Sequence, residues 1–186
     1  MHDLVAITAL GGTERRIDTI AGVTCTERPD VALASVAARL GQDEKARKAL
    51  GKLIGAPAPE VECFDGTVPA AFWTGPDQWM VEAPFETHEN LAQDVKKGVG
   101  KSASVTEQTD AWTRFDLIGD GVLAVLELLC PIDTRKMQSG QAKRASIHHL
   151  GCVVLCRSAD DFSIYGPRAS AGTLHHALVT AMKSAL

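Results

Sequence analysis

The sequence has few aromatic residues and no long hydrophobic run. Only 5% of its 186 residues are Phe, Trp or Tyr, whereas 45% are hydrophobic, an ordinary share for a globular protein. No apolar stretch approaches the roughly 18 residues that a membrane-spanning helix requires. The first residues lack both a basic start and a long apolar segment, so they do not read as a secretory signal. We therefore expect a cytoplasmic protein with no membrane partner.

The sequence also lacks a basic block and a regular cysteine pattern. Its formal net charge is −4, which disfavours a nucleic-acid partner. The five cysteines are odd in number and form no CxxC spacing, so reduced thiols are favoured over a disulfide framework. These cysteines are Cys25, Cys63, Cys130, Cys152 and Cys156.

The chain does contain a pattern that occurs twice. Residues 72–84 read FWTGPDQWMVEAP, in which a Gly-Pro-Asp turn between two short apolar segments predicts a β-hairpin. A helical pattern follows over residues 87–97. Residues 155–167 read LCRSADDFSIYGP and are followed by a second helical pattern, over residues 170–185. We interpret the two hairpin–helix segments as an internal duplication.

The alignment behind this interpretation is short. When Pro84 is placed on Pro167, Trp79 falls on Phe162. The identities are few, so a chance similarity between two unrelated hairpin–helix units stays open as the alternative.

The remaining periodicity predicts an α+β domain of antiparallel sheet with packed helices. Residues 1–27 are expected to form an N-terminal arm with room for one strand. Residues 28–186 are expected to form a single domain, with repeat-related lobes over about 28–110 and 111–186. We expect helices over 30–40, 43–54 and 120–129, strands over 102–108, 112–118, 151–156 and 162–165, and loops over 56–68 and 133–146.

Residues 119–124 match the GxGxxA pattern of a dinucleotide site between a strand and a helix. The preceding strand carries Arg114 and Asp116, whereas the buried first strand of such a site is almost wholly apolar. No second strand ending in an acid follows about 20 residues later. Asp120 would also place a negative charge beside the phosphates. We interpret the pattern as a strand–helix turn.

No other residues form a recognisable active site. Neighbouring side chains diverge on a strand or helix, so neither the histidines at 148–149 nor those at 175–176 predict a metal site. The aspartates at 160–161 are interpreted as turn formers. The basic loop at 135–144 and Arg168 suit an anion or an interface about equally. We therefore predict no catalytic, cofactor-binding or metal-binding residue.

Interface residues are predicted from residue type and strand alternation, because stable interfaces draw on aromatic residues and arginine. Trp112 and Arg114 lie on the polar face of the strand expected at 112–118, whereas Phe115 lies on its core face. The alternative, that every tryptophan belongs to the core, stays open. The candidate interface residues are Trp73, Trp112, Arg114 and Arg168.

The sequence resembles the gamma subunit of heterotetrameric sarcosine oxidase. The resemblance rests on residues 31–41, 72–84, 106–133 and 160–178, the last reading DDFSIYGPRASAGTLHHAL. It covers most of the chain beyond residue 28, and the first 27 residues contribute little.

That subunit is in turn similar to the folate-binding domain of the glycine-cleavage aminomethyltransferases. In this wider family an aspartate, a glycine before a helix and a later aspartate recur, as Asp110, Gly119 and Asp133 do here. The resemblance implies an aminomethyltransferase-like fold with a duplicated antiparallel unit. The chain is much shorter than a full aminomethyltransferase.

The resemblance implies an accessory, non-catalytic subunit of a complex that oxidatively demethylates sarcosine to glycine. The complex also yields hydrogen peroxide and formaldehyde, or methylene-tetrahydrofolate when tetrahydrofolate is the co-substrate. The expected partners are the alpha, beta and delta subunits, which would hold FAD, FMN, NAD and zinc, whereas this chain would hold no cofactor. The alternative is a stand-alone folate-binding protein of C1 transfer.

Overall fold

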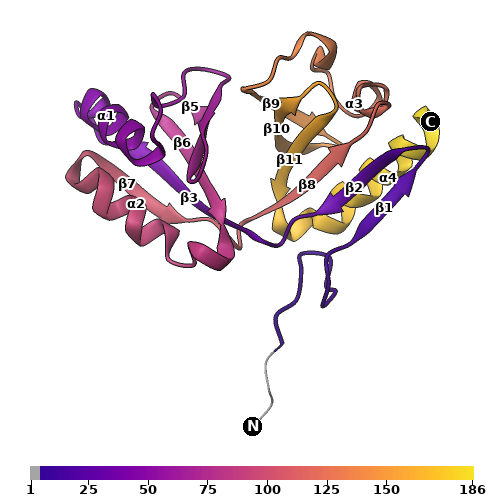
Figure 1. Cartoon of the computed structure of the whole chain (residues 1–186), viewed down its shortest axis with the longest axis horizontal. Coiled ribbons are helices and arrows are strands. Elements are labelled where there is room, and N and C mark those ends of the chain that lie inside the picture. Colours follow the sequence, from indigo (N-terminus) through magenta and orange to yellow (C-terminus); the bar gives the residue numbers. More distant parts are fainter. Residues whose placement is uncertain (1–4) are drawn as a thin grey trace. The chain divides into compact units, whose positions relative to one another are not determined.

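The structure, a computed structural model, describes residues 5–186, which divide into two compact units (Figure 1). Unit 1 comprises the described part of Met1–Pro29 together with Ala111–Ser139 and Arg144–Leu186. Unit 2 comprises Asp30–Asp110 and Gly140–Lys143. Each unit has a hydrophobic core of its own.

Unit 1 is built on a six-stranded antiparallel sheet of order β1-β2-β8-β11-β10-β9. Helices α3 and α4 pack on it and, with Cys130 and Met137 from the segment after α3, contribute the rest of its core. The strands are β1 (Ile17–Ile20), β2 (Val23–Glu27), β8 (Trp112–Ile118), β9 (Gln141–Ile147), β10 (Leu150–Ser158) and β11 (Asp161–Pro167), and the helices are α3 (Val122–Leu129) and α4 (Ala171–Ala185). The first residues of β9, up to Lys143, are grouped with unit 2.

Unit 2 is built on a five-stranded antiparallel sheet of order β4-β5-β6-β3-β7. Helices α1 and α2 complete its core. The strands are β3 (Val31–Ala38), β4 (Phe64–Gly66), β5 (Ala70–Gly75), β6 (Gln78–Pro84) and β7 (Ala103–Glu107), and the helices are α1 (Asp43–Ile54) and α2 (Leu91–Val99).

The two units share one succession of elements: a strand, a helix, three strands and a helix. In unit 2 this is β3-α1-β4-β5-β6-α2, and in unit 1 it is β8-α3-β9-β10-β11-α4. The sheet orders β4-β5-β6-β3 and β9-β10-β11-β8 correspond as well. Both predicted hairpins form, and Trp79 and Phe162 each lie buried in the core of their own unit. The shared topology agrees with a duplication, which itself stays a prediction.

The polar atom of the Trp79 side chain is hydrogen-bonded inside the core of unit 2. Its ring is fully buried, and its indole N–H donates to the carbonyl of Pro59 at 2.8 Å. The guanidinium of Arg47 lies 5.1 Å from the ring centroid, within the range of a cation–π contact. A buried indole therefore keeps both its hydrogen bond and its apolar contacts.

The prediction of a helix over residues 30–40 is wrong. These residues form β3, which lies between β6 and β7 in the sheet. Ala32, Leu33, Ala34 and Val36 are all buried, so both faces of this strand are covered. A strand buried on both faces loses the alternation of apolar and polar residues, and its apolar positions then also fit a helical spacing.

Two predicted irregular segments contain strands. The loop expected over residues 133–146 ends in β9, in which Ala142, Ala145 and Ile147 are buried between polar neighbours. The N-terminal arm, expected to have room for one strand, contains two, because β1 and β2 pair as a hairpin and β2 pairs with β8. The helix expected over 87–97 begins later, at Leu91.

Among residues 5–186, no helix is both long enough and apolar enough to span a lipid bilayer.

The GxGxxA pattern is accounted for by close packing of the turn between β8 and α3. Gly119 has φ +140°, and a Cβ atom there would lie 2.3 Å from the carbonyl oxygen of Gly22 and 2.9 Å from Cα of Val23. A Cβ on Gly121 would lie 2.4 Å from the side chain of Leu186. Gly119 therefore permits the β8–α3 turn to approach the backbone of β2.

We expect Gly119→Ala to lower the free energy of unfolding by at least about 1–3 kcal/mol, because the new methyl group meets backbone atoms that cannot rotate away. Gly172→Ala is the matched control. A Cβ there meets nothing within 4 Å and lies in α4, so this change should raise stability by up to about 1 kcal/mol. Urea denaturation followed by tryptophan fluorescence measures both, and equal effects of the two variants would contradict the packing argument.

Candidate functional site

The carboxylate of Asp116 on β8 is the centre of a buried network of charged and polar groups. Asp116 is only 3% exposed. Arg114 donates to it twice, from Nε at 2.7 Å and from Nη2 at 2.9 Å. Arg28 donates from Nη1 at 2.7 Å, and the hydroxyl of Ser163 donates at 2.7 Å. The carboxylate is therefore held by four hydrogen bonds, three of them from guanidinium groups.

The sheet places these groups by simple strand geometry. Arg114 and Asp116 are two residues apart on β8 and so share a face. In the ladder between β8 and β11, Ser163 lies opposite Asp116 and Tyr165 lies opposite Arg114. The Arg114 guanidinium lies 5.9 Å from the Tyr165 ring centroid. Arg28 follows β2 on the other side of β8, where its backbone N–H donates to the carbonyl of Arg114 at 2.9 Å.

The surroundings of Asp116 keep it ionised. Burial by itself would raise the pKa of this carboxyl, because the charged form loses water. The charge and hydrogen bonds of Arg114 and the hydrogen bond from Ser163 outweigh burial, with a further contribution from the charge of Arg28. The pKa of Asp116 therefore lies below its usual range. Because its acceptor positions are taken, Asp116 holds strands together rather than acting as a free base.

Asp161 lies near the same network, but its pKa is shifted in the opposite direction. Its Oδ1 is buried and has no hydrogen-bond partner in the described part of the chain. Burial raises the pKa of this carboxyl, and the nearby charge of Asp116 raises it further, although Arg157 and Arg114 act in the other direction. Arg157 donates from Nε to the hydroxyl of Ser163 at 2.6 Å. Asp161 is therefore the carboxyl in this network best suited to bind a proton.

Three of the four predicted interface residues lie together in unit 1. Trp112 is partly exposed and lies opposite Pro167 in the ladder of β8 and β11. Arg168 follows directly, and its backbone N–H donates to the carbonyl of Ala111 at 3.0 Å. The side chain of Arg114 is only 11% exposed, since it is committed to Asp116. Of the three, Trp112 and Arg168 retain exposed surface, whereas Arg114 mainly binds within the chain.

Trp73, the fourth predicted interface residue, lies in unit 2. It is the cross-strand partner of Trp79 and is partly exposed. Its indole nitrogen is nevertheless buried and without a hydrogen-bond partner among residues 5–186. Phe72, its neighbour on β5, is buried on the opposite face of the sheet. Trp73 therefore extends the row of core side chains that includes Trp79, with part of its ring at the surface.

The family positions Asp110, Gly119 and Asp133 do not form a buried acidic centre. Asp110 is exposed and belongs to unit 2. Asp133 is largely exposed in unit 1, where its carboxylate binds Nζ of Lys136 at 2.7 Å. Gly119 serves the close turn described above.

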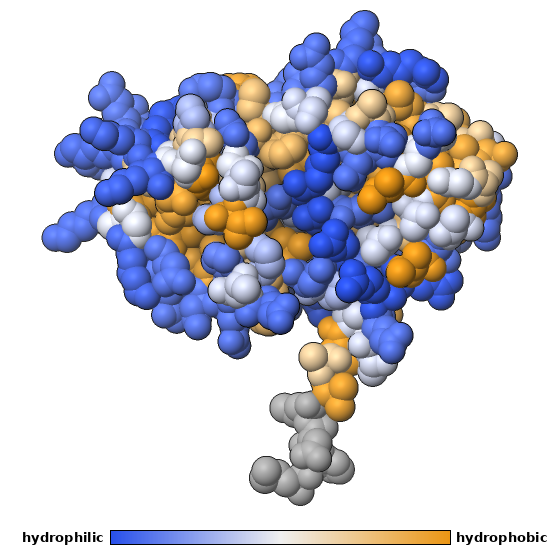
Figure 2. All heavy atoms as spheres, viewed as in Figure 1, coloured by the Kyte–Doolittle hydropathy of each residue, from blue (hydrophilic) through white to orange (hydrophobic). Residues whose placement is uncertain are grey.

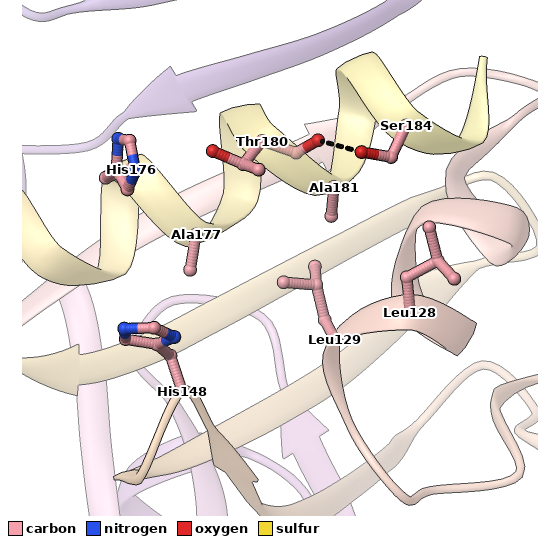
Figure 3. Close-up of a pocket in the computed structure, with 8 residues that line it drawn as sticks. All are labelled: Leu128, Leu129, His148, His176, Ala177, Thr180, Ala181 and Ser184. Atoms are coloured by element: carbon pink, nitrogen blue, oxygen red, sulfur yellow. Dashed lines mark hydrogen bonds between the residues drawn. The ribbon is translucent and has the colours of Figure 1, made fainter.

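A surface hollow of about 410 Å³ lies between α3, α4 and the turn that joins β9 to β10 (Figure 3). Leu128, Leu129, Ala177 and Ala181 contribute apolar surface, and Figure 3 shows His148 and His176 together at the end away from Leu128. Its remaining lining residues are Thr180 and Ser184. Two imidazoles are fewer than the three protein ligands of a catalytic zinc site.

The turn that carries His148 has an uncommon backbone. His148 and His149 have φ +48° and +68°, the left-handed values of a two-residue hairpin turn in which Asn-Gly is the preferred pair. Histidine is among the non-glycine residues found more often in this region. The sequence-based interpretation of the two pairs of histidines did not anticipate this turn.

Sequence reasoning missed Arg28, Arg157 and Ser163 as partners in the Asp116 network. Arg28 lies 88 residues from Asp116 and Ser163 lies 47 residues from it, so no local spacing connects them to Asp116. Arg157 is six residues from Ser163, in the same hairpin, and enters the network through it. The only local signal was the alternation of Arg114 and Asp116, which was interpreted as a solvent-facing or partner-facing surface.

We expect Asp116→Asn to lower the free energy of unfolding by about 3 kcal/mol at neutral pH, because it leaves the largely buried guanidinium of Arg114 and the partly exposed guanidinium of Arg28 without their counter-charge. The pKa of Asp116 is lowered on folding, so its contribution is present above the unfolded value of about 3.9 and is lost as pH falls through the folded pKa. The difference between variant and wild type should therefore shrink below about pH 4. Glu127→Gln, in the exposed pair with Arg135, is the control and should change little.

Asp161→Asn should raise the free energy of unfolding, whereas Asp116→Asn lowers it. A raised folded pKa means that ionised Asp161 opposes folding once the pH exceeds the folded pKa, whereas at low pH both states are protonated and the effect vanishes. The melting temperature of the variant should therefore exceed that of wild type at high pH and equal it in acid. A variant that melts below wild type at high pH would show that Asp161 is stabilising as a charge.

Comparison of the sequence with protein-family models finds no match, and comparison with curated proteins finds none either. Among solved structures, a chain of heterotetrameric sarcosine oxidase from Corynebacterium sp. U-96, in complex with pyrrole 2-carboxylate, superposes with a TM-score of 0.76 at 20% identity. The match covers 90% of this chain and 87% of that one.

Glycine cleavage system aminomethyltransferase T from Bartonella henselae superposes with a TM-score of 0.66 at 16% identity. The match covers 87% of this chain but only 46% of the aminomethyltransferase. At these identities the likeness shows the fold. The chain has a mixed fold of helices and two antiparallel sheets that it shares with a sarcosine oxidase chain and with part of an aminomethyltransferase.

Proposed function

We propose that this chain is an accessory subunit of a multi-subunit amine oxidase of the sarcosine oxidase type, in the position of the gamma subunit. The observation that carries the proposal is the extent of the structural match, which covers 90% of this chain and 87% of the sarcosine oxidase chain. The match to the aminomethyltransferase covers only 46% of that protein, so the sarcosine oxidase chain is the better guide to a role. The sequence resemblance to the gamma subunit points the same way.

In this proposal the complex carries out the chemistry and the chain supports its assembly. The complex demethylates sarcosine to glycine in the cytoplasm, with hydrogen peroxide and formaldehyde or methylene-tetrahydrofolate as further products. FAD, FMN, NAD and zinc belong to the alpha, beta and delta subunits, and tetrahydrofolate is a co-substrate. The heavily paired Asp116 supports a structural role for the buried charges of unit 1.

Exposed hydrophobic side chains provide candidate surface for such a partner. Val5 and Ile7 are mostly exposed, and Figure 2 shows hydrophobic atoms in the segment next to the grey residues. The Ile7 carbonyl accepts a hydrogen bond from Nη2 of Arg168 at 3.2 Å, which connects this segment to a predicted interface residue. Trp112 adds an aromatic side chain with exposed surface. Such residues are typical of protein interfaces.

Co-purification tests the proposal directly. The tagged chain, co-expressed with alpha, beta and delta subunits of a sarcosine oxidase, should recover a yellow complex that oxidises sarcosine and releases hydrogen peroxide. The same chain purified alone should be colourless and inactive. A flavin spectrum in the isolated chain, or no recovery of any of the three subunits, would overturn the proposal.

Trp112→Ala should reduce recovery of the partner subunits while lowering the melting temperature only slightly, because the side chain is partly exposed. Trp79→Ala is the matched control. Trp79 is fully buried, and its truncation should cost about 3–5 kcal/mol of stability. Pull-down yield and thermal melting measure the two effects. If Trp112→Ala destabilises the isolated chain as strongly as Trp79→Ala, Trp112 belongs to the core.

The second candidate function is folate binding by the chain itself, as in a C1-transfer protein of the aminomethyltransferase type. The structural likeness to aminomethyltransferase T favours it, although the chain spans less than half of that protein. Titration with tetrahydrofolate, followed by the fluorescence of Trp73, Trp79 and Trp112, distinguishes the two. Saturable quenching by the isolated chain supports folate binding, and an unchanged spectrum at high ligand concentration rejects it.

A further inference from the structure

The hollow between α3, α4 and the β9–β10 turn follows one face of α4 (Figure 3). The α4 residues that line it recur at alternating intervals of one and three, which is the spacing of a single helix face. They extend over two turns from His176 to Ser184, a length of about 12 Å at the rise of an α-helix. The volume of about 410 Å³ falls within the range of small-molecule sites. The hollow therefore has the length and volume for an extended ligand.

One part of the hollow is apolar. Leu128, near the end of α3, is 60% exposed, and Leu129 beside it is partly buried. Figure 3 shows Leu129 pointing toward α4, from which the small side chains of Ala177 and Ala181 point back. Covering an exposed leucine side chain is favourable in proportion to the apolar area removed from water. This part of the hollow therefore favours a hydrocarbon group.

The other end of the hollow is polar. It contains the imidazoles of His148, from the β9–β10 turn, and of His176, from α4 (Figure 3). Both residues are exposed, and neither imidazole has a hydrogen-bond partner among residues 5–186. Because a two-residue hairpin turn of this kind favours Asn-Gly, its backbone does not require histidine at position 148. Both rings are therefore accessible to a ligand and have nitrogen atoms with which to bind it.

The polar atoms of the hollow favour an anionic head group with a single charge. None of the described residues that line it is Asp or Glu, so nothing there would balance an ammonium group. None is Lys or Arg either, which disfavours a multiply charged group such as phosphate. A neutral imidazole donates one hydrogen bond, and an imidazolium donates two and carries a positive charge. Such donors match the oxygens of a carboxylate.

We propose that this hollow binds a medium-chain aliphatic carboxylate, with its carboxylate at His148 and His176 and its hydrocarbon chain along Leu129 and Leu128. The extended length of octanoate is comparable to the two turns of α4 that line the hollow. All the residues involved belong to unit 1, and the site does not depend on the function proposed above.

NMR titration of the purified full chain with octanoate, below its micelle-forming concentration, tests the site. Among the imidazole Cε1–H signals of the six histidines, those of His148 and His176 should shift saturably with one dissociation constant, whereas that of His88 in unit 2 should not move. 1-Octanol, which lacks the carboxylate, and octylammonium, which has the opposite charge, should bind at least about tenfold more weakly. Equal binding of 1-octanol, or no saturable shift with millimolar octanoate, would reject the proposal.

The dependence of affinity on chain length tests the apolar part of the hollow. From hexanoate to octanoate, each added CH₂ group should tighten binding about two- to threefold, because a fully buried CH₂ group gives about fourfold and this hollow is open to solvent on one side. Equal affinities for acetate and octanoate would show that the leucines take no part in binding and would contradict the proposal.

Paired variants locate the carboxylate. His148→Asn removes one imidazole from a left-handed backbone position that asparagine tolerates, and it should weaken octanoate binding about fivefold. His149→Asn is the matched control, because His149 lies in the same turn with φ +68° but does not line the hollow. On α4, His176→Ala should weaken binding by a similar factor, whereas Thr173→Ala, at another exposed position of that helix, should not.

A third pair of variants locates the hydrocarbon chain. Leu128→Ala should weaken octanoate binding about three- to tenfold, whereas Leu40→Ala, at a fully exposed leucine of unit 2, should leave it unchanged. All these variants change exposed side chains, so the fold should be retained, and thermal melting verifies this. Wild-type affinity in His148→Asn, His176→Ala or Leu128→Ala would place the ligand elsewhere and overturn the proposal.

Discussion

Four hydrogen bonds converge on one carboxylate in unit 1, and the arrangement of its central strands depends on them. Asp116 on β8 is bound by Arg114 from its own strand, by Ser163 from β11 and by Arg28 from the end of β2. A buried ion pair adds little net stability over an apolar core, because the charges lose water. Its effect here is on register: a shift of one residue in either neighbouring strand would turn a partner to the opposite face.

The helix-covered core and the charged network occupy opposite faces of the same strand. Phe115 and Leu117 enter the core with side chains from α3 and α4, whereas Arg114 and Asp116 lie on the other face. On that face Asp116 is buried and is bonded to protein groups rather than to water, whereas Trp112 and Ile118 at the two ends of the strand keep exposed surface. The predicted core face of β8 is confirmed by Phe115 and Leu117, and the partner face stays a prediction, in which Arg114 is bound to Asp116 within the chain.

Local signals in the sequence predicted local structure well. The turn residues of both hairpins, the glycine after α1 and the alternation in β8 each identify an element that forms. The main failures arise from burial and long-range contacts, which a local pattern does not encode. β3 is covered on both faces and so resembled a helix, and the bonds to Arg28 and Ser163 join residues far apart in the chain. The fold is shared with proteins of different chemistry, so function has to be argued from sites.

The path of the chain has a consequence for the order in which it folds during synthesis. Thr24 of β2 pairs with Ile118 of β8, and nearly all of unit 2 is encoded between them. At about 5–20 residues per second, β2 emerges on the order of ten seconds before its partner strand. Unit 2 has most of its contacts within one continuous segment and can collapse during this interval. The β1–β2 hairpin meanwhile has an unpaired edge, so on the ribosome it is open to pairing with another chain until β8 emerges.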